Sequence, residues 1–491
     1  MIDRPLTLDV VGHVLRSAGL LREMRGPGDV AVLGVSQDSR AVRPGDLFLA
    51  WKGTAVDAHD HVDAAREAGA VAAVVERPLG IELPQLVVSD GRRAAALTAQ
   101  AVMGDPSRRL FLVGITGTNG KTTTAMLVRH LLSPRGGCAV VGTLGLVDAG
   151  GVRPGTEGLT TPGPVQVATW LRQLADEGTS TVVVEASSHA LEQRRLDGIR
   201  FAAGVFTNLT QDHLDYHADL GAYLAAKARL ASLVHPGGWL VVNRDDRAWD
   251  GLDAAGRRVR SFAVDAPADV RAERVLSDAR GSRFKLVMEG ACADVELPLL
   301  GAYNVENALA AAAVASVVGM SVERVAGALA TVPQVTGRLE MVVREPFAVI
   351  IDFAHTPDAL EGALGTLKPL TRGRLIVLFG AGGDRDRTKR RPMAESVARR
   401  ADLVVLTSDN PRTEDPEAIL DDLARGLQGR AYARIADRRE AIRHALSQAR
   451  PGDTVVLAGK GHETYQVVGR EKRPFDERIV VRECLAALGA A

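Results

Sequence analysis

The sequence predicts an α/β protein of three domains: an N-terminal domain, a central domain with a parallel sheet like that of P-loop ATPases, and a C-terminal Rossmann-like domain. The chain has 491 residues, which is more than a single hydrophobic core holds. After residue 107, apolar runs that suit strands alternate with helical stretches, as in parallel sheets covered by helices. A glycine-rich turn at 115–124 lies between such a run and a helical stretch, which is typical of a phosphate-binding loop.

The composition suits a soluble enzyme that acts on small molecules. The 60 basic residues balance 60 acidic ones, and only 4% of the residues are aromatic. We expect no nucleic-acid partner, because the chain has neither a basic tract nor enough aromatic rings for base stacking. Its three cysteines lack metal-ligand spacing, which fits a reducing compartment. The segment from Met1 to Pro5 lacks the apolar stretch of a signal peptide, and no apolar run reaches the roughly 20 residues of a membrane span, so we expect a cytoplasmic protein. We also expect it to be a monomer.

Breaks in the strand and helix pattern predict where the domains meet. The first range holds short elements, such as a strand at 46–50, and ends where Asp105-Pro106-Ser107 interrupts the pattern. The third range begins near Gly337. We therefore predict domains at 1–107, 108–335 and 336–491.

The turn after the apolar run at 110–113 predicts a nucleotide site. Glycines let the backbone approach a phosphate, Lys121 reaches the terminal phosphates, and the Thr122 hydroxyl suits Mg²⁺. Ile115 stands where the usual P-loop has glycine, so a glycine turn with a chance Lys-Thr pair is the alternative. The flanking strand and helix favour a nucleoside triphosphate. The binding candidates are Gly117, Thr118, Asn119, Gly120, Lys121, Thr122 and Thr123.

Polar residues follow six further apolar runs directly. Because ligands of parallel sheets bind beyond the carboxyl ends of the strands, six such ends indicate a site. We expect the loops of the central and third domains to face each other across a cleft. The runs are 181–184, 203–206, 349–351, 375–379, 403–406 and 455–457.

Glu185 is the first candidate for a metal ligand at these ends. A carboxylate that ends an apolar strand is costly unless it is paired or metal-bound, and with Thr122 it could hold Mg²⁺. His213 could add a nitrogen ligand or simply cap its loop. Lys227 lies on a predicted helix, where the residues alone favour an exposed surface lysine.

Cations after three different strands indicate a second ligand that carries carboxylates. Arg385, Arg412 and Lys460 each follow an apolar run, although solvated turn cations are the alternative. The phrase Asp-Asn-Pro-Arg at 409–412 is more specific, because its proline fixes the backbone between hydrogen-bonding side chains. Asn304 and Asn307 share one helical face, where they could cap the helix or bind an adenine edge.

Four motifs together resemble the Mur ligase family, the ATP-dependent amino-acid ligases of peptidoglycan synthesis. They are Gly-Thr-Asn-Gly-Lys-Thr at 117–122, Glu-Ala-Ser-Ser-His at 185–189, Thr-Asn-Leu at 207–209 with Asp-His-Leu-Asp at 212–215, and Tyr-Asn-Val at 303–305. The resemblance covers all three predicted domains. Within the family, Asp-Asn-Pro-Arg is the version associated with meso-2,6-diaminopimelate, whereas lysine-adding members carry other residues at the arginine position.

The resemblance implies roles for individual residues. Lys121 and Thr122 bind the phosphates of ATP and its Mg²⁺, with Glu185 and His213 as further metal ligands. Lys227 matches a lysine that becomes carbamylated, which would make it an anionic ligand. The catalytic set is thus Lys121, Glu185, His213 and Lys227. The residues implied around the nucleotide are Asn304, Asn307, Arg338, Asp352 and His355.

The resemblance also implies an order of substrates. ATP would activate the D-glutamate side-chain carboxylate of a UDP-muramoyl dipeptide as an acyl phosphate, which the amine of diaminopimelate then attacks. Ser39 would contact the uridine end. The muramoyl dipeptide residues are Thr160, Thr161, Ser187, Gln193 and Arg195. The diaminopimelate residues are Arg385, Asp409, Asn410, Pro411, Arg412, Gly459 and Glu463.

Two other functions compete with this one. A ligase of the folylpolyglutamate type shares the P-loop chemistry, but the dedicated first domain and the motif at 409–412 count against it. A nucleotide-dependent scaffold that binds cell-wall precursors without catalysis is the second alternative. The presence of Lys121, Glu185, His213 and Lys227 counts against a scaffold.

Overall fold

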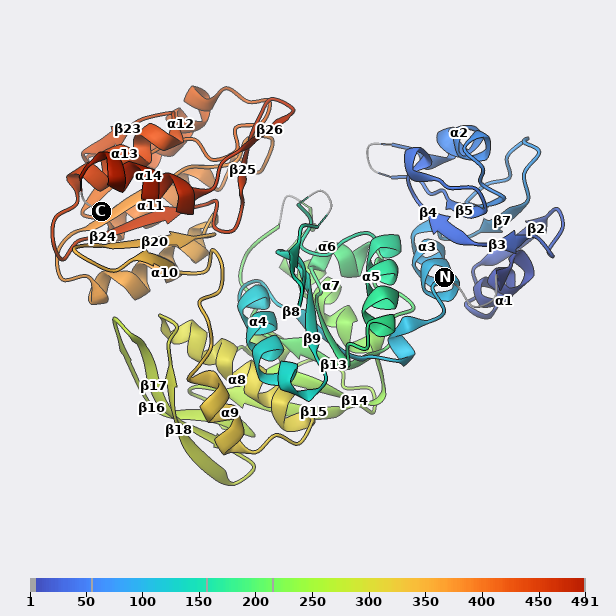
Figure 1. Ribbon diagram of the computed structural model, residues 1–491, viewed down its shortest axis with the longest axis horizontal. Helices are drawn as coiled ribbons and strands as arrows, with labels where there is room; N and C mark the ends of the chain where they lie inside the picture. The colour runs from blue at the N-terminus through green and yellow to red at the C-terminus, as the bar shows by residue number, and fades with distance from the viewer. Residues whose placement is uncertain (1–5, 54–55, 156–157, 214–215, 490–491) are drawn as a thin grey trace.

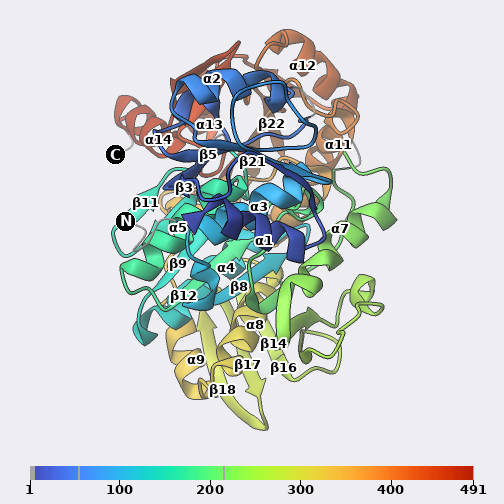
Figure 2. The ribbon, with the colours of Figure 1, turned by 90° about the vertical axis from the view of Figure 1, so that its right-hand side faces the viewer.

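The computed structural model describes residues 6–53, 56–155, 158–213 and 216–489. The chain forms three large sheets, each drawn from one continuous part of the sequence. In Figure 1 the N-terminal and C-terminal parts lie at opposite ends of the longest axis, with the central part between them, and Figure 2 looks along this axis from the N-terminal end. Helices cover sheets that are mainly parallel, so the predicted α/β class is confirmed.

The first sheet has five strands in the order β2-β7-β6-β5-β4, and only the β2–β7 pair is antiparallel. Buried residues of α1 and α3 pack on one face, and Val62 and Ala65 of α2 pack on the other. Its strands are β2 (Leu21–Arg25), β4 (Gly34–Ser36), β5 (Asp46–Leu49), β6 (Ala72–Val75) and β7 (Gln85–Val88). Its helices are α1 (Leu8–Ser17), α2 (Val62–Glu67) and α3 (Gly91–Val102), and a small pair of β1 (Leu6–Thr7) and β3 (Ala31–Val32) lies beside them.

The central sheet has eleven strands in the order β11-β10-β9-β12-β8-β13-β14-β15-β16-β17-β18. The strands from β9 to β16 in this order run parallel, and both edges continue as antiparallel hairpins that the sequence pattern did not predict. The strands are β8 (Phe111–Thr116), β9 (Cys138–Gly142), β10 (Gly145–Asp148), β11 (Gly151–Arg153), β12 (Thr181–Glu185), β13 (Phe201–Phe206), β14 (Val234–Asn243), β15 (Arg258–Ala263), β16 (Val270–Asp278), β17 (Gly281–Met288) and β18 (Ala291–Leu297).

The central parallel strands are buried on both faces. Val183 faces one hydrophobic cluster, while its neighbours Val182 and Val184 face the other. This explains why the strand is a continuous apolar run rather than an alternating one. The helices are α4 (Lys121–Leu132), α5 (Pro164–Asp176), α6 (Ser188–Glu192), α7 (Leu220–Leu233), α8 (Ala302–Val317) and α9 (Val322–Leu329).

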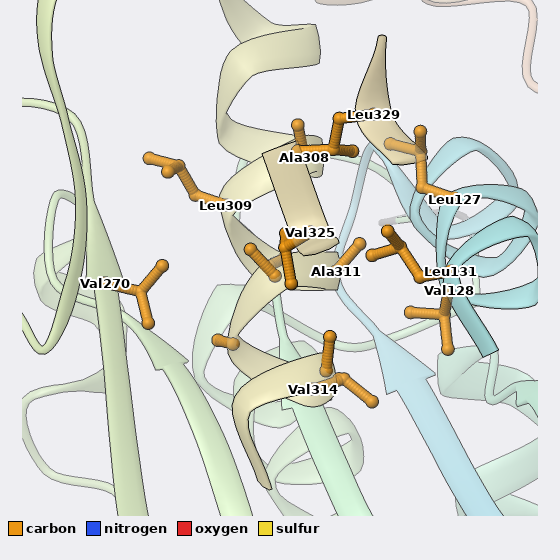
Figure 3. Close-up of a cluster of buried hydrophobic side chains, with 14 of the residues drawn as sticks. Leu127, Val128, Leu131, Val270, Ala308, Leu309, Ala311, Val314, Val325 and Leu329 are labelled. Atoms are coloured by element: carbon orange, nitrogen blue, oxygen red, sulfur yellow. The ribbon is translucent and has the colours of Figure 1, made fainter. Parts of the chain in front are cut away.

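The larger central cluster forms where α4, α8 and α9 meet. Leu127 and Leu131 of α4 point toward Ala311 of α8, with Val325 of α9 beside them (Figure 3). Helix α8 is rich in alanine and is buried along most of its length, as expected for a helix that is apolar all round. This packing holds the start of α8 next to the start of α4, where the phosphate-binding loop ends.

The third sheet has six strands in the order β19-β20-β24-β21-β22-β23, all parallel except β19. Helices α10 to α12 cover one face, and α13 and α14 cover the other. The strands are β19 (Glu340–Val343), β20 (Ala348–Asp352), β21 (Leu375–Phe379), β22 (Leu403–Leu406), β23 (Tyr432–Arg434), β24 (Thr454–Ala458) and the separate hairpin β25 (Tyr465–Val468) with β26 (Glu471–Pro474). The helices are α10 (Pro357–Leu370), α11 (Arg390–Arg400), α12 (Pro416–Ala424), α13 (Arg438–Gln448) and α14 (Glu477–Ala487).

All six predicted strands with polar ends exist, as β12, β13, β20, β21, β22 and β24. The loops that follow β12 and β13 leave the same edge of the central sheet as the phosphate-binding loop, because these strands are parallel to β8. Within the parts of the chain that the structure describes, no helix combines the length and apolar character needed to cross a membrane.

Candidate active site

The predicted phosphate-binding loop joins the end of β8 to the start of α4. Gly117 and Gly120 have φ angles of +147° and +85°, which favour glycine. A Cβ on Gly117 would overlap the Thr207 hydroxyl, and one on Gly120 would overlap the Asn307 amide oxygen. The loop therefore has no space for side chains at either position.

Lys121 folds back over this loop. Its Nζ donates to the carbonyl oxygens of Gly117 and Thr118, both at 2.9 Å. Burial lowers the pKa of Lys121, while the carboxylates of Glu185 and Asp212 oppose that shift. The ammonium thus lies at the helix N-terminus, where a phosphate would be held.

The loop after β13 braces the phosphate-binding loop. Thr207 Oγ1 donates to the Asn119 carbonyl at 2.8 Å, and the Asn119 amide donates to Asn208 Oδ1 at 2.8 Å. The Thr118 amide donates to the Asn208 carbonyl at 2.7 Å. The sequence motif at 207–209 pointed to the family but not to this supporting role.

Glu185 is fully buried at the end of β12, and its carboxylate accepts hydrogen bonds from neighbouring hydroxyl groups. Thr122 Oγ1 donates to its Oε2 at 3.0 Å. Thr143 donates to it twice, from its amide at 3.0 Å and from its hydroxyl at 2.9 Å. Carboxylate and hydroxyl oxygens are the ligands that Mg²⁺ prefers, so Thr122 and Glu185 fit that ion. Thr143 was missed in the sequence, although it follows β9 just as the other polar residues follow their strands.

His213 lies at the same edge of the sheet, in a backbone conformation with φ +54°. Its Nε2 is 3.5 Å from Asp212 Oδ2, and its ring centroid is 4.7 Å from that of His189. Among the described residues, no group of three or more His, Cys, Asp or Glu side chains could hold a metal ion. Leu214 and Asp215 of the same motif lie outside the described residues.

Lys227 is buried, so the surface position favoured by the residues alone is wrong. Its side chain projects from α7 under the phosphate-binding loop, is 1% exposed, and donates to the Gly117 carbonyl at 2.7 Å. Its Nζ also lies 4.3 Å from the centre of the Tyr223 ring. Burial, with the neighbouring ammonium of Lys121, holds the pKa of Lys227 well below its usual range. The lowered pKa makes the neutral, nucleophilic form of this amine easier to reach than in an exposed lysine.

The two asparagines of α8 form a chain that leads to α4. Asn304 Nδ2 donates to the Leu300 carbonyl at 2.8 Å, and Asn307 Nδ2 donates to Asn304 Oδ1 at 2.9 Å. Asn307 Oδ1 accepts from the Thr124 hydroxyl at 3.1 Å. The capping role is not found, since α8 has no side-chain cap: Asn304 ties the first turn of α8 to the preceding loop, while Asn307 holds α8 against α4.

Residues after the second domain reach the phosphate-binding loop. Arg338 Nη2 donates to Thr122 Oγ1 at 3.1 Å, and its guanidinium lies 4.7 Å from the centre of the Phe353 ring. Asp352 accepts from the amides of Leu339 and Ala354, although burial raises its pKa. Burial lowers the pKa of His355 to about 4, so it is neutral near pH 7.

Gly337 precedes Arg338 in the segment that links the central domain to the third domain. Its φ is +68°, and a Cβ there would overlap the backbone of Gly461 and His462. The Gly337 amide donates to Glu340 Oε2 at 2.7 Å. The linker that touches the phosphate-binding loop therefore packs directly against the loop after β24.

The candidates for the muramoyl dipeptide form one hydrogen-bonded group beside Glu185. Thr161 Oγ1 donates to the Glu185 carbonyl at 2.6 Å and accepts from the Ser187 amide at 3.0 Å. Arg195 donates to the Thr161 carbonyl at 2.8 Å and to Gln193 Oε1 at 2.6 Å. The remaining member, Thr160, has its hydroxyl 3.5 Å from that of Thr143.

Ser39 lies apart from this group, in the short turn η1 (Ser39–Ala41) of the first domain. The adjacent loop does meet the central domain, because a Cβ on Gly163 would lie 2.7 Å from Gln37 Nε2. The loops of the central and third domains also approach each other, since a Cβ on Gly158 would lie 3.3 Å from the Tyr465 hydroxyl.

The third domain brings together the candidates for the amino-acid substrate. Arg412 has φ +52° and donates from Nη1 to the Gly383 carbonyl at 2.7 Å. Burial and the nearby guanidinium of Arg385 lower the pKa of Arg412, while the carboxylates of Asp409 and Glu463 oppose this. Asn410 Nδ2 donates to Glu463 Oε2 at 2.8 Å. A Cβ on Gly459 would lie 3.4 Å from Asp409 Oδ2, and Pro411 connects Asn410 to Arg412.

A fully buried ion pair, missed in the sequence, holds two of these loops. Arg438 and Glu477 are 0% exposed, and Arg438 Nη2 lies 2.7 Å from Glu477 Oε1. The same guanidinium donates to the Ser408 carbonyl at 3.2 Å and the Ala458 carbonyl at 3.0 Å. It thus joins the residues that directly precede Asp409 and Gly459.

Replacing Arg438 with Met is expected to destabilise the third domain by about 3–5 kcal/mol, because Glu477 is left as a buried charge without its partner. Urea unfolding measures this change. The double variant Arg438→Met/Glu477→Leu is expected to recover part of the loss, since it removes the unpaired carboxylate. A double variant no more stable than Arg438→Met contradicts the role of the ion pair.

Comparison with known proteins identifies the family of this chain. Family models of the "Mur ligase family, catalytic domain", the "Mur ligase middle domain" and the "Mur ligase, glutamate ligase domain" match residues 32–109, 115–315 and 337–461. A protein of Geobacillus thermodenitrificans (strain NG80-2), named UDP-N-acetylmuramoyl-L-alanyl-D-glutamate–2,6-diaminopimelate ligase, is 42% identical over 93% of this chain and 95% of its own length.

Two further proteins carry the same name. That of Gloeobacter violaceus (strain ATCC 29082 / PCC 7421) is 43% identical over 96% of this chain and 97% of its own length. A solved structure with this name has a TM-score of 0.69 and 33% identity, and covers 99% of this chain and 100% of that one. The chain belongs to the Mur ligase family.

Proposed function

We propose that this enzyme joins 2,6-diaminopimelate to the D-glutamate side-chain carboxylate of UDP-N-acetylmuramoyl-L-alanyl-D-glutamate, with ATP as the source of energy. Relatives that are 42% and 43% identical over nearly the whole chain carry the name of this reaction. The observation that carries the proposal is the group of charges in the third domain. There Arg385 and Arg412 lie near the carboxylates of Asp409 and Glu463.

This mixture of charges suits the far end of diaminopimelate, meaning the end distant from the amine that reacts. That end carries both a carboxylate and an ammonium group. Guanidinium groups bind carboxylates through two parallel hydrogen bonds, so Arg385 and Arg412 suit the two carboxylates of the amino acid. Glu463 suits the ammonium group at the far end. Lysine has the same ammonium group but lacks the second carboxylate, so one arginine would be left without a partner.

ATP would bind across the phosphate-binding loop, with Lys121 on its γ-phosphate. Thr122 and Glu185 would hold Mg²⁺, joined by His213 and the modified Lys227, and the ion would neutralise charge on the phosphates. Residues Asn304, Asn307, Arg338, Asp352 and His355 would surround the rest of the nucleotide. Arg338 supports this placement through its contact with Thr122.

Lys227 would act as a carbamate. Its neutral amine attacks the carbon of CO₂, an N–C bond forms, and one proton leaves the nitrogen, which makes the side chain an anion. The lowered pKa supports this step, because only the neutral amine is a nucleophile. The N–H of the carbamate could still donate to the Gly117 carbonyl, while its two oxygens would be available to the metal ion.

The reaction would proceed in two steps. An oxygen of the D-glutamate side-chain carboxylate attacks the γ-phosphorus of ATP, the bond to the bridging oxygen breaks, and ADP leaves. The amine nitrogen of diaminopimelate then attacks the acyl carbon, the carbon–oxygen bond to phosphate breaks, and inorganic phosphate and a proton are released. Lys121 neutralises the charge that develops on the transferred phosphoryl group. Positioning by the third domain brings the amine to the acyl phosphate.

The same proposal divides the chain at 1–107, 108–335 and 336–491, which keeps each large sheet within one domain. The first domain would bind the uridine end through Ser39. Thr160, Thr161, Ser187, Gln193 and Arg195 would hold the muramoyl dipeptide. We place the enzyme in the cytoplasm as a monomer without nucleic-acid partners, as the sequence predicts.

An amino-acid competition assay tests this function. The purified enzyme is incubated with ATP and UDP-N-acetylmuramoyl-L-alanyl-D-glutamate, together with meso-2,6-diaminopimelate or L-lysine, and phosphate release and the tripeptide product are measured. We expect release that depends on both substrates and favours diaminopimelate. Preferred use of lysine rejects the specificity, and phosphate release that neither substrate stimulates supports a non-catalytic scaffold.

A further inference from the structure

Lys460 is a fully buried lysine at the end of β24 that the proposed reaction does not use. It is 0% exposed, and its Nζ donates to Asn410 Oδ1 at 3.1 Å and to Glu463 Oε2 at 3.0 Å. It also lies 3.6 Å from Asp409 Oδ1. The sequence placed Lys460 among cations for a substrate carboxylate, whereas the structure turns it toward three polar side chains of the protein.

These bonds determine which way the Asn410 amide points. Asn410 Oδ1 accepts from both Lys460 Nζ and the Val467 amide, the latter at 2.9 Å. The amide nitrogen must therefore face the other way, and it donates to Glu463 Oε2 at 2.8 Å. Among the hydrogen bonds of the described residues, both side-chain donors to Glu463 fall on Oε2, so its other oxygen can face a ligand.

Lys460 also determines the balance of charge around this group. The three cations Arg385, Arg412 and Lys460 balance the three carboxylates of Asp384, Asp409 and Glu463. A site whose charges balance accepts a ligand end that is itself neutral overall, with one carboxylate and one ammonium. An end that carries only an ammonium gains no net attraction from these balanced charges.

We propose that Lys460 is a positioning residue that sets the amino-acid specificity, by holding Glu463 and Asn410 and by disfavouring substrates whose far end is purely cationic. The inference rests on the proposed function, because it concerns the amino-acid site of that reaction. This role explains why Lys460 is buried beside Asp409 and Glu463, the carboxylates that a cationic substrate would need. Neutralising Lys460 leaves three carboxylates against two guanidinium groups, and this negative excess favours L-lysine relative to diaminopimelate.

The test compares kcat/KM for meso-2,6-diaminopimelate and for L-lysine in the full-length enzyme. The variants are Lys460→Met, Lys460→Gln and Lys460→Arg, and the matched control is Lys368→Met, a partly exposed lysine of the same domain that pairs with Asp402. We expect the ratio of the two values to fall about tenfold or more in Lys460→Met and Lys460→Gln. Lys460→Arg is expected to keep most of the ratio, and Lys368→Met all of it.

The ratio separates specificity from folding, since both substrates are measured on one sample and the inactive fraction cancels. If turnover by the neutral variants is too slow, equilibrium dissociation constants of the two amino acids give the same comparison. An unchanged ratio in both neutral variants overturns the inference, because a purely structural lysine would affect both substrates equally. A wild-type enzyme that does not use diaminopimelate rejects the proposed function instead.

Discussion

Replacing Lys121 with Met is expected to lower kcat about 10²–10³-fold or more, because it removes the ammonium group that we propose neutralises the transferred phosphoryl group. In the structure Lys121 lies at the start of α4 and donates to two carbonyls of the phosphate-binding loop. Methionine keeps a similar length and apolar stem but cannot neutralise a developing negative charge. Steady-state phosphate release at saturating substrates measures the effect.

The matched control is Lys285→Met, which removes a lysine from β17 in the antiparallel extension of the same domain. We expect this control to keep wild-type activity. Thermal unfolding of both variants checks that the fold is intact. Activity of Lys121→Met within a few-fold of the wild type would remove this lysine from phosphoryl transfer.

Replacing Lys227 with Ala is expected to lower kcat by about 10²-fold or more and to make the enzyme responsive to added carboxylic acids. The alanine variant lacks the nitrogen on which a carbamate forms, and it leaves a space beneath the Gly117 carbonyl. A short acid such as acetate could occupy that space and supply the missing anionic oxygens. Activity measured against acetate concentration is therefore expected to rise toward a plateau.

Lys121→Ala is the control for this rescue, because Lys121 and Lys227 both donate to the Gly117 carbonyl. Acetate should not restore its activity, since the group it lost is a cation. Full activity of Lys227→Ala without any acid would exclude a carbamate from the reaction. Equal stimulation of both alanine variants would show that acetate acts elsewhere.

Much of the fold follows from local patterns. The central parallel strands are buried on both faces, so each one is a short apolar run, and polar residues at its carboxyl end mark the edge where we expect ligands to bind. Thr143 carries the same local signal after β9 and could have been found in the same way. The antiparallel strands β16 to β18 were not foreseen, because attention to apolar runs misses strands that are exposed on one face.

The positions that sequence reasoning missed depend on contacts between distant segments. Lys227 reads as a surface lysine because its helix has polar and apolar neighbours alike, and only the packing of α7 beneath the phosphate-binding loop buries it. Arg438 and Glu477 are 39 residues apart, and nothing near either one indicates a buried partner. Lys460 was grouped correctly with the cations at strand ends, but the direction of its side chain depends on Asn410.

The linker around Gly337 has a mechanical consequence. Arg338 touches Thr122 of the nucleotide site, and its neighbour Gly337 packs on the backbone of Gly461 and His462 beside the amino-acid site. Consecutive Cα atoms are about 3.8 Å apart across a trans peptide. Because Gly337 and Arg338 are consecutive residues, a displacement of the backbone at Gly461 would also displace the guanidinium that contacts Thr122.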